Sequence, residues 1–218
     1  MTGPWLVSLQ LNLNHPAARR DLADAGAVHR RVMSLVRDDL GDHARSTAAV
    51  LYRIEHTRAG IRILAQTGIE PTLANLPDGY AHVPEPRSLH NLLAALQVGT
   101  SIAYRITANT SKRLPREYVG SEGKPGQVIA LRSPDAIQAW WEQRAARNGL
   151  QITSAATTTH DDIRARRVPG TPHAQHAASQ FDGQATVTDP EAVVQAIRKG
   201  IGRGKSFGCG LLSVALIQ

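Results

Sequence analysis

Two kinds of hydrophobic spacing follow one another along this chain in a definite order, and that order restricts the folds it can adopt. In residues 5–13, apolar and polar side chains alternate, as in a strand with one buried face. From about residue 19 to residue 40, apolar side chains recur at helical spacing in one stripe. Two runs with strand composition, 49–55 and 60–66, are joined by a short connection, which predicts a hairpin.

The first half of the chain closes with weaker signals. A segment near residues 71–76 has weak helical character, and a short extended piece spans residues 80–83. Together with the preceding elements, these give the order β-α-β-β-α-β. The run Pro84-Glu85-Pro86 then marks a boundary, so we predict a first domain over residues 1–86 and a second over residues 87–218.

The second half follows the same order with longer insertions. Ser133 is predicted to cap a helix that begins at Pro134 and ends before Gly149. Thr188-Asp189-Pro190 is predicted to cap a last helix that ends near Lys199. Strands are predicted over residues 98–108, 128–131, 150–158, 179–187 and 211–216. The chain is therefore predicted to be an α+β protein made of two tandem ferredoxin-like (RRM-like) β-α-β-β-α-β domains.

The charge balance indicates an acidic partner. The 25 Lys and Arg residues outnumber the 18 Asp and Glu residues, which gives a formal net charge of +7. Nucleic acid is the first candidate for that partner, while the alternative is that the charge serves only solubility.

The single cysteine, Cys209, excludes an internal disulfide and a cysteine-based zinc site. The N-terminus lacks a signal-peptide pattern, and no apolar run approaches the ~20 residues of a spanning helix, so we expect a soluble cytoplasmic protein.

The segment from Gly200 to Gly210 is the most informative stretch of the chain. Five of its eleven residues are glycine, which permits positive φ angles and a close approach of the backbone to a ligand. With Arg203 and Lys205 it suits a phosphate backbone, and a tight turn packed on a sheet is the alternative. It is not a nucleotide-binding P-loop, because Lys199 stands where the first glycine is required and the loop follows a helix.

A family resemblance rests on this same segment. The pattern Gly-apolar-Gly-x-x-Lys-x-apolar-Gly-x-Gly-Leu-Leu-Ser, from Gly200 to Ser213, resembles the signature loop of the CasE family of CRISPR repeat endonucleases. Residues 17–22, followed by His29, resemble the family's first helix, and residues 104–113 resemble its central strand. The resemblance implies a metal-independent enzyme that cuts CRISPR precursor RNA within each repeat, beside a stem-loop. It also implies that the product is retained for the Cascade complex. The expected partners are thus repeat RNA and other Cascade subunits, with no cofactor, no membrane and no direct DNA contact.

His29 is the candidate catalytic residue. RNA cleavage without a metal uses the RNA's own 2′-hydroxyl as nucleophile, so the protein must accept that proton, protonate the leaving 5′-oxygen and stabilise the phosphorane. A histidine suits either proton transfer because its reference pKa is ~6.5. From the helix pattern alone, His29 is more readily a histidine half-packed against the sheet, whereas the resemblance implies the catalytic role. The family commonly places a tyrosine one helical turn earlier, where this chain has Gly26.

The remaining candidates are residues expected to bind RNA. Hairpin arginines can enter a stem-loop groove, and basic loops can follow the strand that leaves the stem. The alternative for each is ordinary solvated charge, and for the whole protein it is a non-catalytic RNA-binding subunit of the same fold. His160, His173 and His176 are predicted to lie in a polar hairpin rather than to bind a metal. The predicted RNA-binding set is Arg19, Arg30, Lys112, Arg113, Arg164, Arg166, Arg167, Gly202, Arg203, Lys205 and Ser206.

Overall fold

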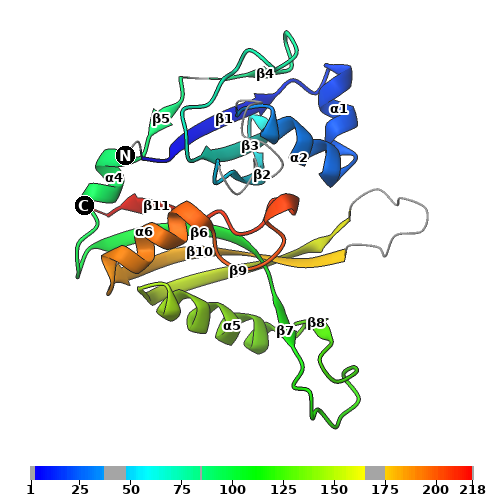
Figure 1. The fold of residues 1–218 in the computed structure, drawn as a ribbon, viewed down its shortest axis with the longest axis vertical. Helices are drawn as coiled ribbons and strands as arrows, with labels where there is room; N and C mark the ends of the chain where they lie inside the picture. Colours follow the sequence, from blue (N-terminus) through cyan, green and yellow to red (C-terminus); the bar gives the residue numbers. More distant parts are fainter. Residues whose placement is uncertain (1–2, 37–47, 84, 165–174, 218) are drawn as a thin grey trace.

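The structure is a computed structural model that describes residues 3–36, 48–83, 85–164 and 175–217, without the side chains of residues 160–164 and 175–176. Its elements form two units stacked along the long axis of the molecule (Figure 1). Each unit is an antiparallel sheet with helices packed on it, so the predicted α+β class is confirmed. None of the helices described is long and apolar enough to cross a membrane.

The first unit is built on a sheet with the strand order β2-β3-β1-β4, to which β5 is added by pairing with β1. Its elements are β1 (Trp5–Leu11), α1 (Pro16–Leu22), α2 (Ala25–Met33), β2 (Leu51–Thr57), β3 (Gly60–Thr67), β4 (Ala81–His82) and β5 (Arg87–Ser88). The alternation predicted for the first strand is confirmed, because Val7, Leu9 and Leu11 are buried against Val28 and Val32 of α2. The predicted hairpin is also confirmed, as β2 and β3.

The helix predicted over residues 19–40 is instead two helices in its described part, and residues 37–40 lie outside the described residues. α1 ends before Ala23, and Asp24 begins α2 by accepting hydrogen bonds from the amides of Gly26 and Ala27, both at 3.1 Å. An N-cap of this kind satisfies the free amides of the first helical turn and starts a new helix at a fixed residue. Both helices pack on the same sheet, so a single apolar stripe continues across the break.

The second unit is built on a sheet with the strand order β11-β6-β10-β9. Its elements are α4 (His90–Ala94), β6 (Ser101–Asn109), β7 (Ser111–Arg113), β8 (Val128–Ala130), α5 (Pro134–Arg147), β9 (Leu150–Arg164), β10 (Gln175–Val187), α6 (Pro190–Lys199), the 3-10 turn η2 (Lys205–Phe207) and β11 (Ser213–Leu216). α5 and α6 pack on this sheet around the fully buried Trp141. Both predicted caps are confirmed: Ser133 accepts a hydrogen bond from the amide of Ala136 at 3.2 Å, and Asp189 accepts one from that of Ala192 at 3.0 Å.

One local prediction is wrong. The segment near residues 71–76 forms turns instead of a helix, because Pro71 and Pro77 leave too few residues between them to nucleate one. The strand predicted over residues 128–131 is confirmed, as a strand over residues 128–130, but it does not join the main sheet. It forms β8, which pairs with β7 in a two-stranded sheet, because β7 continues directly from β6 and offers β8 a local edge.

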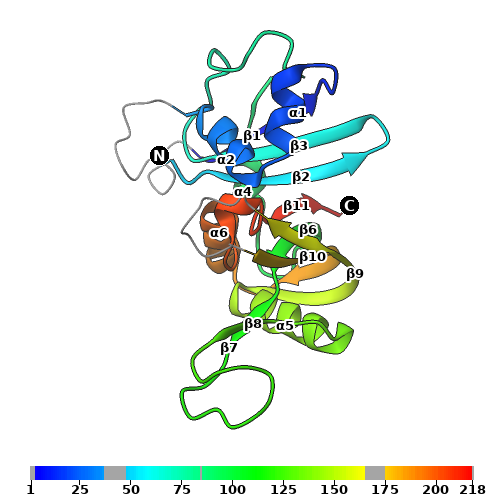
Figure 2. The ribbon, with the colours of Figure 1, turned by 90° about the vertical axis from the view of Figure 1, so that its right-hand side faces the viewer.

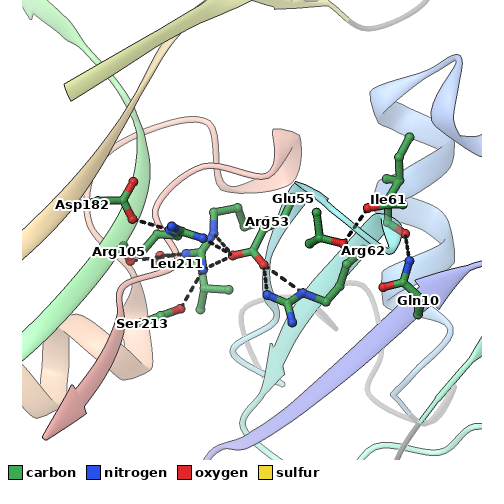
Figure 3. A network of polar contacts seen from close by, with 11 residues as sticks. Gln10, Arg53, Glu55, Ile61, Arg62, Arg105, Asp182, Leu211 and Ser213 are labelled. Atoms are coloured by element: carbon green, nitrogen blue, oxygen red, sulfur yellow. Dashed lines mark hydrogen bonds and ion pairs between the residues drawn. The ribbon is translucent and has the colours of Figure 1, made fainter. Parts of the chain in front are cut away.

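A buried ionic network joins the two units where β2 meets the second sheet (Figures 2 and 3). The side chains of Arg53 and Glu55 are 2% and 4% exposed and form an ion pair at 2.6 Å. Arg53 also donates hydrogen bonds into the second unit, to the carbonyl oxygen of Leu211 at 3.0 Å and to the hydroxyl of Ser213 at 3.1 Å. The guanidinium is therefore satisfied by groups from both units.

Glu55 is the acceptor at the centre of this network. Besides Arg53 it pairs with Arg62 of β3, and it lies 3.7 Å from Arg105 of the second unit, which in turn pairs with Asp182. Burial raises the pKa of Glu55, but attraction to Arg53 and hydrogen bonds from Arg53 and Arg62 outweigh it, so the pKa lies below its ordinary value. The carboxylate thus stays charged and fixes the orientation of one unit on the other.

Candidate active site

His29 lies at the edge of the buried face of α2. The neighbouring Val28 and Val32 are buried in the core of the first unit, whereas His29 is half-buried. Its ring lies nearly parallel to that of Tyr52 on β2, with ring centroids 6.3 Å apart and an interplanar angle of 25°. The imidazole is therefore supported on one side by the protein, and its partial exposure leaves it accessible to a substrate.

Tyr52 is a residue of this site that the sequence did not single out. Its side chain is almost fully buried, and its hydroxyl donates a hydrogen bond to the carbonyl oxygen of Ser206 at 2.8 Å and lies 3.5 Å from that of Ala25. Burial, followed by the charges of Cys209 and Asp24, raises the pKa of Tyr52, so the phenol stays protonated and remains a donor. From the sequence pattern, Tyr52 is one of several residues of this strand expected in the core. In the structure it connects β2, the start of α2 and the glycine-rich loop.

The glycine-rich loop after α6 packs directly on this tyrosine. η2, in the middle of the loop, contacts both α2 and β2. A Cβ atom at Gly208 would lie 3.2 Å from the ring of Tyr52, and one at Gly200 would lie 2.8 Å from a methyl group of Leu51. Both glycines also have positive φ, 79° and 72° respectively. Side chains there would push the loop away from β2, so at these two positions close packing accounts for glycine.

Hydrogen bonds within the protein limit how this loop can bind a phosphate. The amides of Phe207 and Cys209 both donate to the carbonyl oxygen of Gly204, and the amide of Gly210 donates to that of Thr107. These three amides are already satisfied and do not form an anion cradle. The predicted RNA binding by the loop would therefore depend on its side chains and its other amides.

Of the four residues of this loop predicted to bind RNA, Lys205 and Ser206 lie in η2 beside α2, which carries His29, whereas Gly202 lies near Trp140 of α5. Arg203 is exposed, while Gly202, Lys205 and Ser206 are half-buried. Lys205 Nζ donates to a backbone carbonyl at the end of α6 at 2.6 Å, and the carbonyl of Ser206 accepts the hydrogen bond from the buried tyrosine. The fold thus brings Lys205 and Ser206 near the helix of the candidate catalytic residue, and contact of all four residues with RNA stays a prediction.

The two arginines predicted beside His29 have different surroundings. Arg19 donates hydrogen bonds to two backbone carbonyls of the turn before α1, at 3.1 Å and 3.3 Å, so it stabilises that turn. The side chain of Arg30 is 74% exposed and lies 3.7 Å from the carboxylate of Asp24. Both arginines are exposed. Adjacent helix positions point about 100° apart, so Arg30 does not share the direction of His29.

Lys112 and Arg113 lie far from His29. Both are on β7, which projects with β8 at the opposite end of the molecule from α2 (Figure 1). Lys112 pairs with Glu122 at 3.0 Å, and Arg113 donates to the carbonyl oxygen of Gly126 at 2.6 Å. The fold therefore does not bring these two residues to the candidate active site, and RNA binding at this ribbon stays a prediction.

The hairpin that carries the remaining arginines starts from β9 and β10. These strands run together on the side of the molecule where α2 and η2 lie, and Arg164 is paired with Gln175 in their ladder (Figure 1). The side chain of Arg164 lies outside the described part of the chain, as do Arg166 and Arg167. Within the described side chains, no three His, Cys, Asp or Glu residues form a group that could hold a metal ion.

The chain is similar in sequence and in structure to known proteins. A family model described as CRISPR associated protein matches residues 4–215. The CRISPR-associated endoribonuclease Cse3 of Thermus thermophilus is 34% identical over 225 residues, covering 97% of this chain and 99% of that protein. The CRISPR system Cascade subunit CasE of Escherichia coli K12 is 30% identical over 124 residues, covering 55% of this chain and 60% of that protein. The structure of Thermus thermophilus Cse3 bound to an RNA representing a pre-cleavage complex has a TM-score of 0.80 at 33% identity, with 98% of this chain and 99% of that chain covered.

Sequence and fold therefore agree on the class of protein, which is that of the CRISPR-associated proteins. Within this class, the chain belongs to the Cse3/CasE family. The resemblance drawn from the glycine-rich segment and the first helix is confirmed.

Proposed function

We propose that this chain is an endoribonuclease that cleaves CRISPR precursor RNA within each repeat, next to the stem-loop, without a metal ion. It acts in the cytoplasm, retains the mature guide RNA and joins other Cascade subunits. The observation that carries the proposal is the half-buried His29, supported by Tyr52 beside the glycine-rich loop, in a chain that matches an endoribonuclease over 97% of its length. Its two domains span residues 1–86 and 87–218, with β5 of the second domain added to the first sheet.

His29 transfers a proton in this reaction. Attack of the RNA 2′-hydroxyl on the adjacent phosphorus gives a 2′,3′-cyclic phosphate and releases the 5′-oxygen as a hydroxyl. The imidazole either accepts the proton of the 2′-hydroxyl or donates one to the leaving oxygen. The exposed Arg203 in the neighbouring loop stabilises the negative charge that builds up on the phosphorane.

Tyr52 does not replace the tyrosine that the family commonly has at position 26. Its hydroxyl is already bound to the carbonyl oxygen of Ser206, and burial raises its pKa further from neutrality. A buried donor of this kind is poorly suited to exchange protons with a substrate. Tyr52 is a positioning residue that holds the ring of His29.

Cleavage of the cognate repeat RNA should continue in excess chelator. The 2′-hydroxyl and a histidine complete the reaction without a metal-bound water, so removing divalent ions should leave the rate within a few-fold. The measurement is single-turnover cleavage by the purified chain in chelator, with the chemistry of the fragment ends determined. A repeat with 2′-deoxy at the nucleotide upstream of the cut is the control and should not be cleaved. A chain that binds this repeat but leaves it intact with and without Mg²⁺ would be the non-catalytic RNA-binding subunit instead.

Gly26→Tyr should accelerate the chemical step if the absent tyrosine normally shares with the histidine the proton transfer or the charge stabilisation at the phosphate. A Cβ at position 26 would make only ordinary contacts, at 3.4–3.5 Å from Asp24 and Arg30, so the position can accept a side chain. Tyrosine also has a better intrinsic helix propensity than glycine, so the substitution favours the helix by up to about 1 kcal/mol. Gly26→Phe is the matched control, because it has the ring and the helix propensity without the hydroxyl. Faster single-turnover cleavage by Gly26→Tyr than by Gly26→Phe is the expected result, and equal rates would contradict it.

A further inference from the structure

A cavity of about 200 Å³ lies between the two units, next to Tyr52. From the first unit it is lined by Ala25, Tyr52 and Ile54, with His56 also contributing. From the second unit it is lined by Thr107 and Ala178 and, in the glycine-rich loop, by Phe207. It is thus formed only when the two units and the loop are assembled.

The chemistry of this cavity suits a flat aromatic ring with polar edges. Ile54, Tyr52 and Phe207 provide apolar and aromatic wall, of which Phe207 is half-buried and the tyrosine almost fully buried. His56 is exposed, and an imidazole can donate or accept a hydrogen bond. Arg53 also lines the cavity, but its guanidinium is bound to Glu55 and to groups of the second unit, so it is not placed to bind a phosphate. A nucleobase matches both the aromatic walls and the hydrogen-bonding group, since proteins hold unstacked bases on aromatic side chains.

The location of the cavity connects the two parts of the proposed RNA path. Its wall residue Tyr52 also lies against the ring of His29, so the cavity and the group that transfers the proton share this side chain. Its wall residue Ala178 is on β10, near the end of the strand from which the hairpin with Arg164, Arg166 and Arg167 departs. Ala178 and Tyr52 thus place the cavity between this end of β10 and the residue that supports His29.

We propose that this cavity binds the base of the unpaired nucleotide that flanks the scissile phosphate, turned out of the stack and placed against Phe207. The proposal rests on the proposed function and adds a binding site to it. Turning the base out rotates its ribose relative to the next phosphate, which can bring the 2′-hydroxyl in line with the bond to be broken. The cavity thereby determines which phosphodiester meets His29.

The test changes the RNA first, so that it does not depend on the folding of a variant. Repeat RNAs with a single abasic nucleotide on either side of the cut are cleaved by the unaltered chain under single-turnover conditions in chelator. Stacking of a base on an aromatic side chain corresponds to roughly a five- to hundredfold effect, so one of the two abasic RNAs should be cleaved more slowly by about that factor. Equal cleavage of both abasic RNAs and the intact repeat would overturn the proposal.

Phe207→Ala then tests which wall holds the base. It should slow cleavage of the intact repeat by a similar factor, while the abasic nucleotide adds little further loss, because the same contact is removed twice. Val98→Ala is the matched control. Because the side chain of Val98 is 72% exposed, this variant should cleave every RNA at the rate of the parent. Independent losses that multiply would show that the base binds elsewhere. If the unaltered chain does not cleave the intact repeat, the proposed function fails by itself. In that case the affinities of the chain for the intact and abasic repeats are compared, using uncleavable 2′-deoxy versions, and this comparison tests the cavity alone.

Discussion

Replacing His29 with alanine is expected to lower the single-turnover rate of repeat cleavage by about 10²–10⁴, the range for loss of a group that transfers a proton. The affinity for the repeat should stay within a few-fold, because binding of a stem-loop depends mainly on cationic contacts to its backbone. The rate is measured with enzyme in excess over RNA, and the affinity is measured separately on a 2′-deoxy repeat.

The alanine variant also removes a ring that packs on Tyr52, so a second variant separates chemistry from support. His29→Phe keeps an aromatic ring opposite Tyr52 at the same place on α2 but cannot transfer a proton. Both variants should lose cleavage alike, and His29→Phe should unfold at the temperature of the parent within a few degrees. Parental cleavage by His29→Phe would mean that the histidine serves only to pack α2 on β2.

Replacing Glu55 with alanine is expected to destabilise the fold by about 3–5 kcal/mol, because it removes the partner of a buried charge. Arg53, whose side chain is 2% exposed, would keep its charge without the carboxylate that neutralises it, and Arg62 and Arg105 would lose the same partner. The free energy of unfolding is measured by denaturant titration. Glu122→Ala is the matched control, because Glu122 pairs with Lys112 at the surface and should cost no more than about 1 kcal/mol. A similar loss in both variants would show that the network does not hold the units together.

The same residue predicts the behaviour of the protein in acid. The pKa of Glu55 in the folded protein lies below its unfolded value of ~4.3. Its contribution is therefore fully present above that value and is lost as the pH falls through the lower pKa of the folded state. As the pH is lowered below about 4, the free energy of unfolding of the parent should fall more steeply than that of Glu55→Gln, because glutamine cannot gain this proton. Parallel curves would contradict the assignment.

Much of the local structure could be predicted from the sequence because its causes are local. The alternation in residues 5–13 identifies β1, since a strand with one buried face needs every second side chain apolar. Ser133 and Asp189 identify two helix starts, since a cap is formed by a side chain and amides only a few residues away. The clustered glycines and His29 marked the loop and the helix that form the candidate active site. These features are written in neighbouring residues and need no knowledge of the rest of the chain.

Only the tertiary structure decided how these parts meet. Arg53 and Glu55 have the spacing of polar residues on a solvent-facing side of a strand, yet the second unit covers that face and makes them a buried ion pair. Tyr52 has the pattern of any core residue, and its contacts with His29 and with Ser206, 154 positions later in the chain, depend on the packing of the loop on β2. The cavity lined by Ile54, Thr107 and Phe207 is formed by three distant segments. Such contacts depend on how elements pack across large sequence separations, and hydrophobic spacing within one element carries no information about its partner.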